Sequence, residues 1–383
     1  MDIGRAFLCL VLEDIAMATT ADFVIIGGGM AGVSLAAELS REASVLVLEM
    51  EANIGYHSTG RSAAIYIKNY GNKTLRALNA AAEPFFLEPE GVSDSSLLTP
   101  RGELMFAREF ELDAINEYLD GSDGLEDISP KEAGKMIPIL KTDEIVKAAY
   151  EKTARDIDVD RMLQGYSRLL RQNGGQVLTD AAVESMAYVD GVWRLKTKQG
   201  DVEAKVVVNA AGAWGDVVAN LAGVQKVGLT PLRRSAAIIP RPDYDDFESW
   251  PLMVSASESF YAKPEAGKLM VSPADEDPVE PHDAWPDDMV LAEGLHRFEE
   301  ATTVSVERLE HSWAGLRTFA PDRTPVAGFT PEAEGFFWLA GQGGYGIQTA
   351  PALSKASAAL CLGKASILSD EVIEALSPAR FAK

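Results

Sequence analysis

The segment from Ala21 to Glu49 limits the possible folds more than any other part of the chain. It begins as an apolar strand and enters a Gly-x-Gly-x-x-Gly turn, and residues 33–40 then have helical composition. A second apolar strand follows at residues 44–48 and ends directly before Glu49. This order is that of one βαβ unit, which predicts a parallel sheet covered by helices.

The three glycines of the turn are Gly27, Gly29 and Gly32, and Glu49 lies 17 residues after the last of them. Glycines at these positions allow a tight turn and a close approach of the backbone to a pyrophosphate, which the following helix N-terminus attracts. An acid at the end of the second strand can hold ribose hydroxyls. The motif predicts a dinucleotide site without separating FAD from NAD, and a single copy argues against an enzyme with paired NADPH and FAD folds.

In two later segments, an apolar strand is again followed by a glycine-rich turn. Residues 204–216 read AKVVVNAAGAWGD, and residues 335–350 read GFFWLAGQGGYGIQTA before a helix predicted from Pro351 to Leu362. If all of these strands share one sheet, the nucleotide domain is interrupted by an insertion. The second glycine-rich loop would let backbone N–H groups approach a flat ring and stabilise negative charge on it.

Length and charge narrow the class of protein. A chain of 383 residues exceeds the usual size of a single core, so two domains are expected. With 58 acidic against 35 basic residues, the formal charge of -23 opposes binding to nucleic acid. The two cysteines, Cys9 and Cys361, cannot form a disulfide framework, and the four histidines lack metal-ligand spacing. These features predict a cytoplasmic protein without a metal.

The start of the chain allows two interpretations. Residues 6–12 form a short apolar run that could belong to a signal peptide, but Asp2 precedes it and Glu13 and Asp14 follow it. A non-native or disordered extension over residues 1–17 is the favoured interpretation. No other stretch approaches the ~20 apolar residues that span a bilayer. We therefore expect no integral membrane segment, while contact with the inner face of a membrane stays open.

The three segments, in this order and spacing, resemble the D-amino acid oxidase and glycine oxidase superfamily of FAD-dependent oxidoreductases. Within it, the bacterial FAD-dependent D-amino acid dehydrogenases, D-arginine dehydrogenase included, are the branch that the chain resembles most. The most specific likeness is GYHSTGRSAA at residues 55–64, and others are PLRRSA at 231–236, SESFYAKP at 257–264 and HSWAGLRTF at 311–319. The likeness extends from about Ala21 to Ala358.

The resemblance implies an α/β fold with a doubly wound, Rossmann-like FAD-binding domain and an inserted antiparallel-sheet substrate domain. The expected boundaries are 18–80, 150–228 and 312–376 for the FAD-binding domain, and 81–149 and 229–311 for the substrate domain. Noncovalent FAD is expected because no cysteine except Cys361 follows the Arg317 segment. The implied FAD-binding residues are Gly27, Gly29, Met30, Ala31, Gly32, Glu49, Met50, Ser58, Thr59, Gly60, Arg61, Ser62, Ala63, Ala64, Val183, Ala211, Gly212, Trp214, Gly343, Gly344, Tyr345, Gly346, Ile347 and Gln348.

The resemblance also implies a clamp for the substrate carboxylate, which needs a cationic partner when it is buried. Arg234 and Arg317 match the positions that bind this group, and Tyr70 and Tyr261 match two tyrosines that complete the clamp. Tyr70 lies in the polar segment 67–74, which suits a mobile lid.

Four more positions complete the implied pocket. The Gly344 carbonyl would face the substrate amine, and Gln348 would bond near the substrate or the flavin edge. Glu103 matches a carboxylate that recognises a distal guanidinium or ammonium group. Ile65 and Ile67 replace a histidine and a threonine of the D-arginine enzyme, which shifts preference toward apolar side chains by ~1–3 kcal/mol and removes the only histidine expected there.

The resulting prediction is FAD-dependent oxidative deamination of a small-molecule D-amino acid, with hydride transfer from Cα to flavin N5 and no side-chain general base. The imino acid would hydrolyse to a 2-oxo acid and ammonia. The electron acceptor stays open between a quinone-like or respiratory carrier and O2. The alternatives are an enzyme of secondary or N-methyl amino acids, similar to sarcosine and glycine oxidases, and a flavin-binding protein without turnover.

Overall fold

A computed structural model describes residues 18–382, and the extension predicted at residues 1–17 lies outside this range. Its first sheet has a parallel centre in the order β12-β1-β2-β9, with β20 parallel to β12. The strands of this sheet are β1 (Thr19–Ile26), β2 (Val45–Leu48), β9 (Gln176–Leu178), β10 (Val183–Val189), β11 (Val192–Thr197), β12 (Gly200–Asn209), β19 (Val326–Phe329) and β20 (Phe336–Ala340). The predicted βαβ unit is confirmed, since β1 and β2 pair in parallel around a helix.

Both faces of the first sheet are covered. Along β1, Phe23 and Ile25 pack into one core cluster and Val24 and Ile26 into another. Strands buried on both faces read as continuous apolar runs, which is why the β1 sequence lacks alternation. The helices of this half are α1 (Met30–Leu39), α2 (Lys73–Leu87), α5 (Val159–Gln172), α6 (Gly215–Leu221), α8 (Gly346–Cys361) and α9 (Asp370–Leu376). The doubly wound α/β class predicted from the sequence is confirmed.

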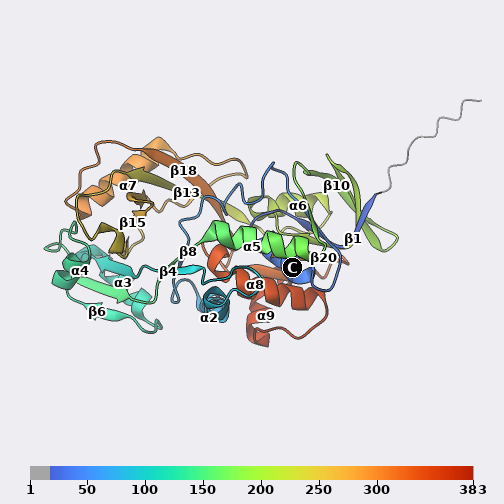
Figure 1. Ribbon diagram of the computed structural model, residues 1–383, viewed down its shortest axis with the longest axis horizontal. Helices are drawn as coiled ribbons and strands as arrows, with labels where there is room; N and C mark the ends of the chain where they lie inside the picture. The colour runs from blue at the N-terminus through green and yellow to red at the C-terminus, as the bar shows by residue number, and fades with distance from the viewer. Residues whose placement is uncertain (1–17, 383) are drawn as a thin grey trace, which may run out of the picture.

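The second sheet forms the other half of the molecule, on the left in Figure 1 together with three helices. Its strands are β5 (Glu103–Ala107), β6 (Glu126–Ile128), β7 (Lys147–Glu151), β13 (Thr230–Ile239), β14 (Leu252–Ser255), β15 (Tyr261–Glu265), β16 (Lys268–Ser272), β17 (Asp277–Pro278) and β18 (His311–Phe319). Its helices are α3 (Leu112–Leu119), α4 (Pro130–Met136) and α7 (Asp288–Ala301). The pairing is antiparallel except between β14 and β5, which run parallel.

A small third sheet, β3 (Ile65–Tyr66), β8 (Arg155–Ile157) and β4 (Leu98–Pro100), lies where the chain passes between the two halves. Segments from distant parts of the sequence therefore alternate between the halves, as the predicted insertion requires. No helix in the part of the chain that the structure describes is long and apolar enough to cross a membrane.

Two element boundaries differ from the sequence-based expectation. Residues 312–319, assigned to the FAD-binding part, belong to β18 and pair with β13 of the second sheet. Helix α8 begins at Gly346 rather than Pro351, and Pro351 lies inside it. Pro351 is the sixth residue of α8, beyond the four N–H groups that lack partners within the helix, so it removes one bond of the helix and does not mark the start.

Candidate active site

A long groove runs from the glycine turn after β1 to the glycine loop before α8, and most of the implied FAD-binding residues line it. These are Gly27, Gly29, Met30, Ala31, Glu49, Met50, Ser58, Thr59, Arg61, Ser62, Ala63, Val183, Ala211, Gly212, Trp214, Gly343, Gly344, Gly346 and Ile347. The groove lies at the carboxyl ends of the parallel strands, where open α/β sheets bind their ligands.

The backbone of the first turn is compatible only with glycine. Gly27 has φ +113°, and a Cβ there would lie 2.4 Å from the Ala210 carbonyl oxygen. A Cβ on Gly32 would lie 2.0 Å from the Gly27 carbonyl oxygen. Gly29 directly precedes α1, so the positive end of the helix dipole meets the groove there, and the Met30 N–H donates to the Thr59 hydroxyl at 3.0 Å. This is a cradle for a pyrophosphate.

Glu49 lies at the end of β2 and is 7% exposed. Burial raises the pKa of its carboxyl, and the Glu51 and Gly28 backbone N–H groups oppose that rise by donating hydrogen bonds of 2.9 and 2.7 Å. The carboxylate is thus held in place at the groove wall. It can accept from the ribose hydroxyls of a dinucleotide, as the sequence predicted.

Two groove residues that the sequence analysis did not single out have buried polar atoms without a partner in the described chain. These atoms are the Thr318 hydroxyl and the Gln342 amide nitrogen. Buried polar groups are nearly always bonded, so both are consistent with a ligand that supplies partners. Their segments were recognised as family-like, but only the arginine and the glycines in them stood out by residue type.

Five implied FAD-binding residues do not line the groove. Gly32 packs on the Gly27 backbone, and Gly60 closes a turn through its N–H to the Gly55 carbonyl. Tyr345 packs behind Tyr70, with ring centroids 4.7 Å apart. The other two, Ala64 and Gln348, line a second, adjoining pocket.

The second pocket brings together all nine residues proposed for substrate binding. They are Ile65, Ile67, Tyr70, Glu103, Arg234, Tyr261, Arg317, Gly344 and Gln348. They come from both halves of the molecule and from segments up to 283 positions apart, yet they line one cavity that adjoins the groove at Gly344 and Ile347. Further lining residues that the sequence analysis did not name include Met105, Tyr118, Leu252, Val254, Glu258 and Lys263.

Arg317 is the most unusual charge in this pocket. Its guanidinium donates to the Tyr70 hydroxyl at 3.4 Å, and within residues 18–382 no carboxylate lies within 4.0 Å of it. Burial alone would lower the pKa of Arg317, but the Tyr70 and Tyr261 oxygens outweigh burial and raise it. Because no carboxylate of the described chain contacts the guanidinium directly, an anion that enters the pocket would supply a bidentate partner.

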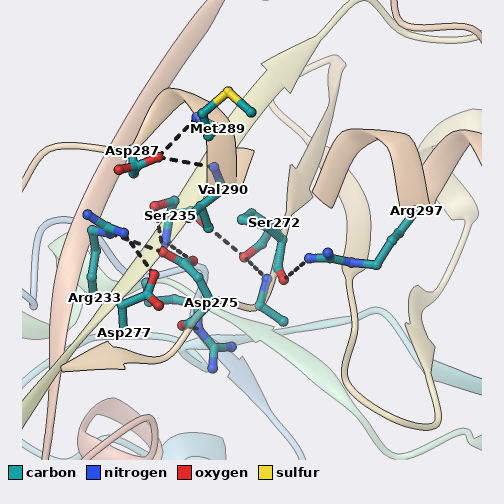
Figure 2. A network of polar contacts seen from close by, with 12 residues as sticks. Arg233, Ser235, Ser272, Asp275, Asp277, Asp287, Met289, Val290 and Arg297 are labelled. Carbon is teal, nitrogen blue, oxygen red and sulfur yellow. Dashed lines mark hydrogen bonds and ion pairs between the residues drawn. The ribbon is translucent and has the colours of Figure 1, made fainter. Parts of the chain in front are cut away.

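Arg234 is held more tightly by the protein itself. Its Nε donates to the Asp275 carbonyl oxygen at 2.8 Å, and its guanidinium pairs with Glu276 at 3.0 Å. Asp275 is anchored in turn, because its carboxylate accepts from the Ser235 N–H at 2.6 Å and from the Ser235 hydroxyl at 2.9 Å. Figure 2 shows Asp275 between Ser235 and Arg233 in this network.

Tyr261 lies close enough to Arg317 and Arg234 for both charges to act on its hydroxyl. The Arg234 guanidinium carbon lies 5.9 Å from the Tyr261 ring centroid. Burial acts to raise the pKa of Tyr261, but Arg317 and Arg234 outweigh burial and lower it. The Tyr261 hydroxyl is therefore a strengthened hydrogen-bond donor beside the unpaired Arg317.

Glu103 occupies the far end of the pocket and is 5% exposed. The Tyr118 hydroxyl donates to it at 3.1 Å, and no cation among the described residues forms an ion pair with it. Burial, with help from the Glu151 charge, raises the pKa of Glu103 to about 8. The carboxyl is therefore mostly protonated at neutral pH.

The wall between these polar ends is apolar. Ile67, Met105, Leu252 and Val254 belong to one buried cluster, against which Ile65 packs. The replacements at 65 and 67 thus line the pocket with branched apolar surface, as the sequence predicted.

Gln348 differs from its expected role. Its amide oxygen accepts from the Ile67 N–H at 3.0 Å, and its amide nitrogen donates to Asn79 at 2.9 Å. Both polar groups are occupied by the protein, so Gln348 holds the Tyr70 segment rather than offering free groups to the substrate.

The chain matches known proteins over most of its length. The family model described as "DAO: FAD dependent oxidoreductase" matches residues 22–360. Human mitochondrial dimethylglycine dehydrogenase is 23% identical over 88% of this chain, which spans 42% of that protein's length.

Solved structures confirm the same fold. The L-proline dehydrogenase of P. horikoshii superimposes with a TM-score of 0.81 at 23% identity, over 95% of this chain and 98% of that one. Glycine oxidase from Geobacillus kaustophilus gives 0.82 at 21% identity, over 95% and 99%. The glycine cradle, the carboxylate at Glu49 and the family match agree, and the chain therefore belongs to the family of FAD-dependent oxidoreductases, with FAD as its cofactor.

Proposed function

We propose that this protein oxidises the amine-bearing carbon of an amino acid carboxylate. The observation that carries the proposal is Arg317, a half-buried cation without a carboxylate partner in residues 18–382, set beside Tyr70 and Tyr261 in a pocket that adjoins the FAD groove. An arginine fork binds a carboxylate through two hydrogen bonds, and tyrosine hydroxyls can complete the site. A flavin-binding protein without turnover would have no use for such a clamp.

The pocket residues have separable tasks. Arg317 with Tyr261 binds and orients the carboxylate, Arg234 adds positive charge that Glu276 partly neutralises, and the Gly344 carbonyl accepts from the amine. FAD, when bound, takes the hydride. The apolar wall excludes water during transfer, which strengthens each electrostatic contact. The described pocket lining includes no histidine, and we propose that the substrate amine loses its proton to water or on binding rather than to another side chain such as Glu258.

Secondary or N-methyl amino acids are the substrate class that the comparisons favour. The relatives include enzymes named for dimethylglycine and sarcosine, and the structural neighbours include a proline dehydrogenase and glycine oxidases. The apolar wall at Ile65, Ile67 and Val254 supports a substrate with an apolar substituent on nitrogen or Cα, since glycine would leave this wall uncovered.

D-amino acids with apolar or basic side chains are the second candidate, and Glu103 is the observation that favours them. An acid at the far end of a long pocket lies where a distal ammonium or guanidinium would reach. A cation there would also favour the ionised form of Glu103. This candidate agrees with the resemblance of the chain to the D-arginine dehydrogenase branch.

FAD is proposed to bind without a covalent link. Cys361, the only cysteine in the described chain, lies at the end of α8 and lines neither the groove nor the pocket. Heat or acid denaturation should therefore release free FAD into the supernatant.

Anaerobic bleaching of the flavin tests these proposals together. The panel should contain sarcosine, N-methyl-L-alanine, L-proline, D-leucine and D-arginine, each with its enantiomer where one exists. Bleaching by secondary amino acids supports the first class, and bleaching only by D-amino acids supports the second. Admission of air, and separately of a soluble quinone, then identifies the acceptor. A flavin that stays oxidised with every compound would refute the proposed function.

A second experiment tests the absence of a side-chain base. The pH dependence of kcat/KM should be measured with several substrates, each in normal and α-deuterated form. An ionisation that follows the substrate amine from one substrate to the next supports the proposal. One that keeps a single value in every case would contradict it.

A further inference from the structure

The turn that carries Tyr70 is held by buried polar groups from three elements. We call residues 67–71 the Tyr70 turn; its Tyr70 N–H donates to the Ile67 carbonyl. Glu151 at the end of β7 is 1% exposed, Asn79 in α2 is 0% exposed and Gln348 in α8 is 3% exposed. Each of them directs its hydrogen bonds into this one turn. A plain surface loop would have water as its partner instead.

Glu151 makes the strongest of these connections. Its two carboxylate oxygens accept from the Lys68 N–H at 2.9 Å and from the Asn69 amide at 2.8 Å. Asn69 is fixed on its other side by the backbone of Asp123, through bonds of 2.9 and 3.0 Å. No cation in the described chain pairs with Glu151. This buried carboxylate is therefore satisfied by three neutral donors: the two from the turn, and the Thr153 hydroxyl at the longer distance of 3.3 Å.

The opposite side of the turn is fixed by Asn79, whose amide donates to the Tyr70 carbonyl at 3.0 Å. The Tyr70 backbone is thus held between β7 and α2, and its hydroxyl meets Arg317 at 3.4 Å. The register of β5 and β7 pairs Glu151 with Glu103, so Glu151 adjoins the far end of the pocket as well.

We propose that Glu151 is a positioning residue for the carboxylate clamp: its two hydrogen bonds to the Tyr70 turn set the place of the Tyr70 hydroxyl against Arg317. The proposal rests on the proposed function, because the clamp must bind a carboxylate. Glu151 touches neither substrate nor FAD in this scheme. It also changes the earlier expectation for residues 67–74, because a turn with these bonds is a fixed wall rather than a mobile lid.

Glu151→Gln tests the proposal, since the amide keeps the size but offers one acceptor where two donors point. The affinity of the FAD-loaded protein for benzoate and for acetate is measured from the change in flavin absorbance during titration. Glu151→Gln should weaken binding about tenfold, which corresponds to ~1.4 kcal/mol. Glu299→Gln is the matched control, because Glu299 bonds the Val306 N–H at 2.6 Å far from the pocket, and it should bind as the wild type does.

A double-mutant cycle separates positioning through Tyr70 from a general loss of structure. In a Tyr70→Phe background, Glu151→Gln should weaken binding less than about twofold, because the hydroxyl that it places is gone. An equal loss in both backgrounds would overturn the proposal. If Glu151→Gln does not fold, Asn69→Ala removes one of the two bonds from the other side, and the same cycle applies with the same two outcomes.

Binding by the wild-type protein distinguishes failure of the Glu151 role from failure of the proposed function. Carboxylate binding by the wild type together with unchanged binding by Glu151→Gln would overturn the role of Glu151 and leave the proposed function standing. A wild type that binds neither benzoate nor acetate, and that no amino acid bleaches, would overturn the clamp and the positioning role with it.

Discussion

Replacing Arg317 with methionine should weaken both the binding of a carboxylate and the stability of the fold. Methionine keeps much of the volume and removes the only pocket cation that lacks a carboxylate partner among the described residues. A substrate carboxylate would then lose its charged, bidentate partner, which costs about 3 kcal/mol, or about 150-fold in affinity. The substrate-free protein would lose a cation whose pKa is raised because Tyr70, Tyr261 and Glu258 outweigh its burial, so the fold should lose about 1–3 kcal/mol.

The assay combines benzoate titration of the FAD-loaded protein with thermal unfolding of the same samples. Arg317→Met should bind benzoate about 150-fold more weakly and unfold a few degrees lower. Arg194→Met is the control, because Arg194 is half exposed and pairs with Glu203 on the surface at 2.9 Å. Unchanged affinity would refute the clamp. A higher unfolding temperature would show that burial of the charge costs more than its tyrosine and glutamate neighbours offset.

Three further results are expected. Burial raises the pKa of Glu103 to about 8, so its neutral form stabilises the fold fully below pH 4.5 and this stability is lost as the pH rises toward 8. Glu103→Gln should remove the loss, matching the wild type at pH 4 and exceeding its unfolding temperature at pH 8; equal curves from pH 4 to 9 would argue against the protonated acid. Gly27→Ala places a Cβ 2.4 Å from the Ala210 carbonyl, so the protein should purify with little flavin, seen as a low 450 nm to 280 nm absorbance ratio. Normal flavin content would show that the turn can relax, and Gly363→Ala, at another positive-φ glycine with nothing within 4 Å of its Cβ, controls for backbone strain. Ile67→Thr puts a hydroxyl into the apolar wall and should reduce kcat/KM for apolar substrates by about 5–30-fold, or ~1–2 kcal/mol, with no such loss for D-arginine; a uniform loss for all substrates would point to damaged packing instead.

The FAD-binding half was largely readable from the sequence because its determinants are local. A glycine turn, the helix after it and an acid at the next strand end occur within residues 21–49, and the structure has them in that order. Local sequence gave a wrong boundary for α8, because Pro351 was predicted as the start of the helix and the helix begins at Gly346.

The pocket residues were identified from residue type together with family likeness. The contacts that hold these residues in place could not be predicted from the sequence. Arg234 and Arg317 were identified, but the restraint of Arg234 by Asp275 and Glu276 depends on the loop between β16 and β17, 41 and 42 positions away. Gln348 stood next to a glycine loop and suggested a ligand contact, whereas its amide bonds Ile67 and Asn79.

By itself, the sequence determined the dinucleotide fold, the FAD site and the identity of the charges in the pocket. The fold follows from short-range patterns along the chain, whereas FAD and the roles of the pocket charges came from the family resemblance of the same segments. The tertiary structure decided which charges are free. Arg317 and Glu103 lack counter-ions among the described residues, whereas Arg234 has Glu276, because pairing depends on strands and loops far apart in sequence. The same long-range packing places Glu151 against the Tyr70 turn. No local sequence pattern, such as the glycine turn of the FAD site, predicts that contact.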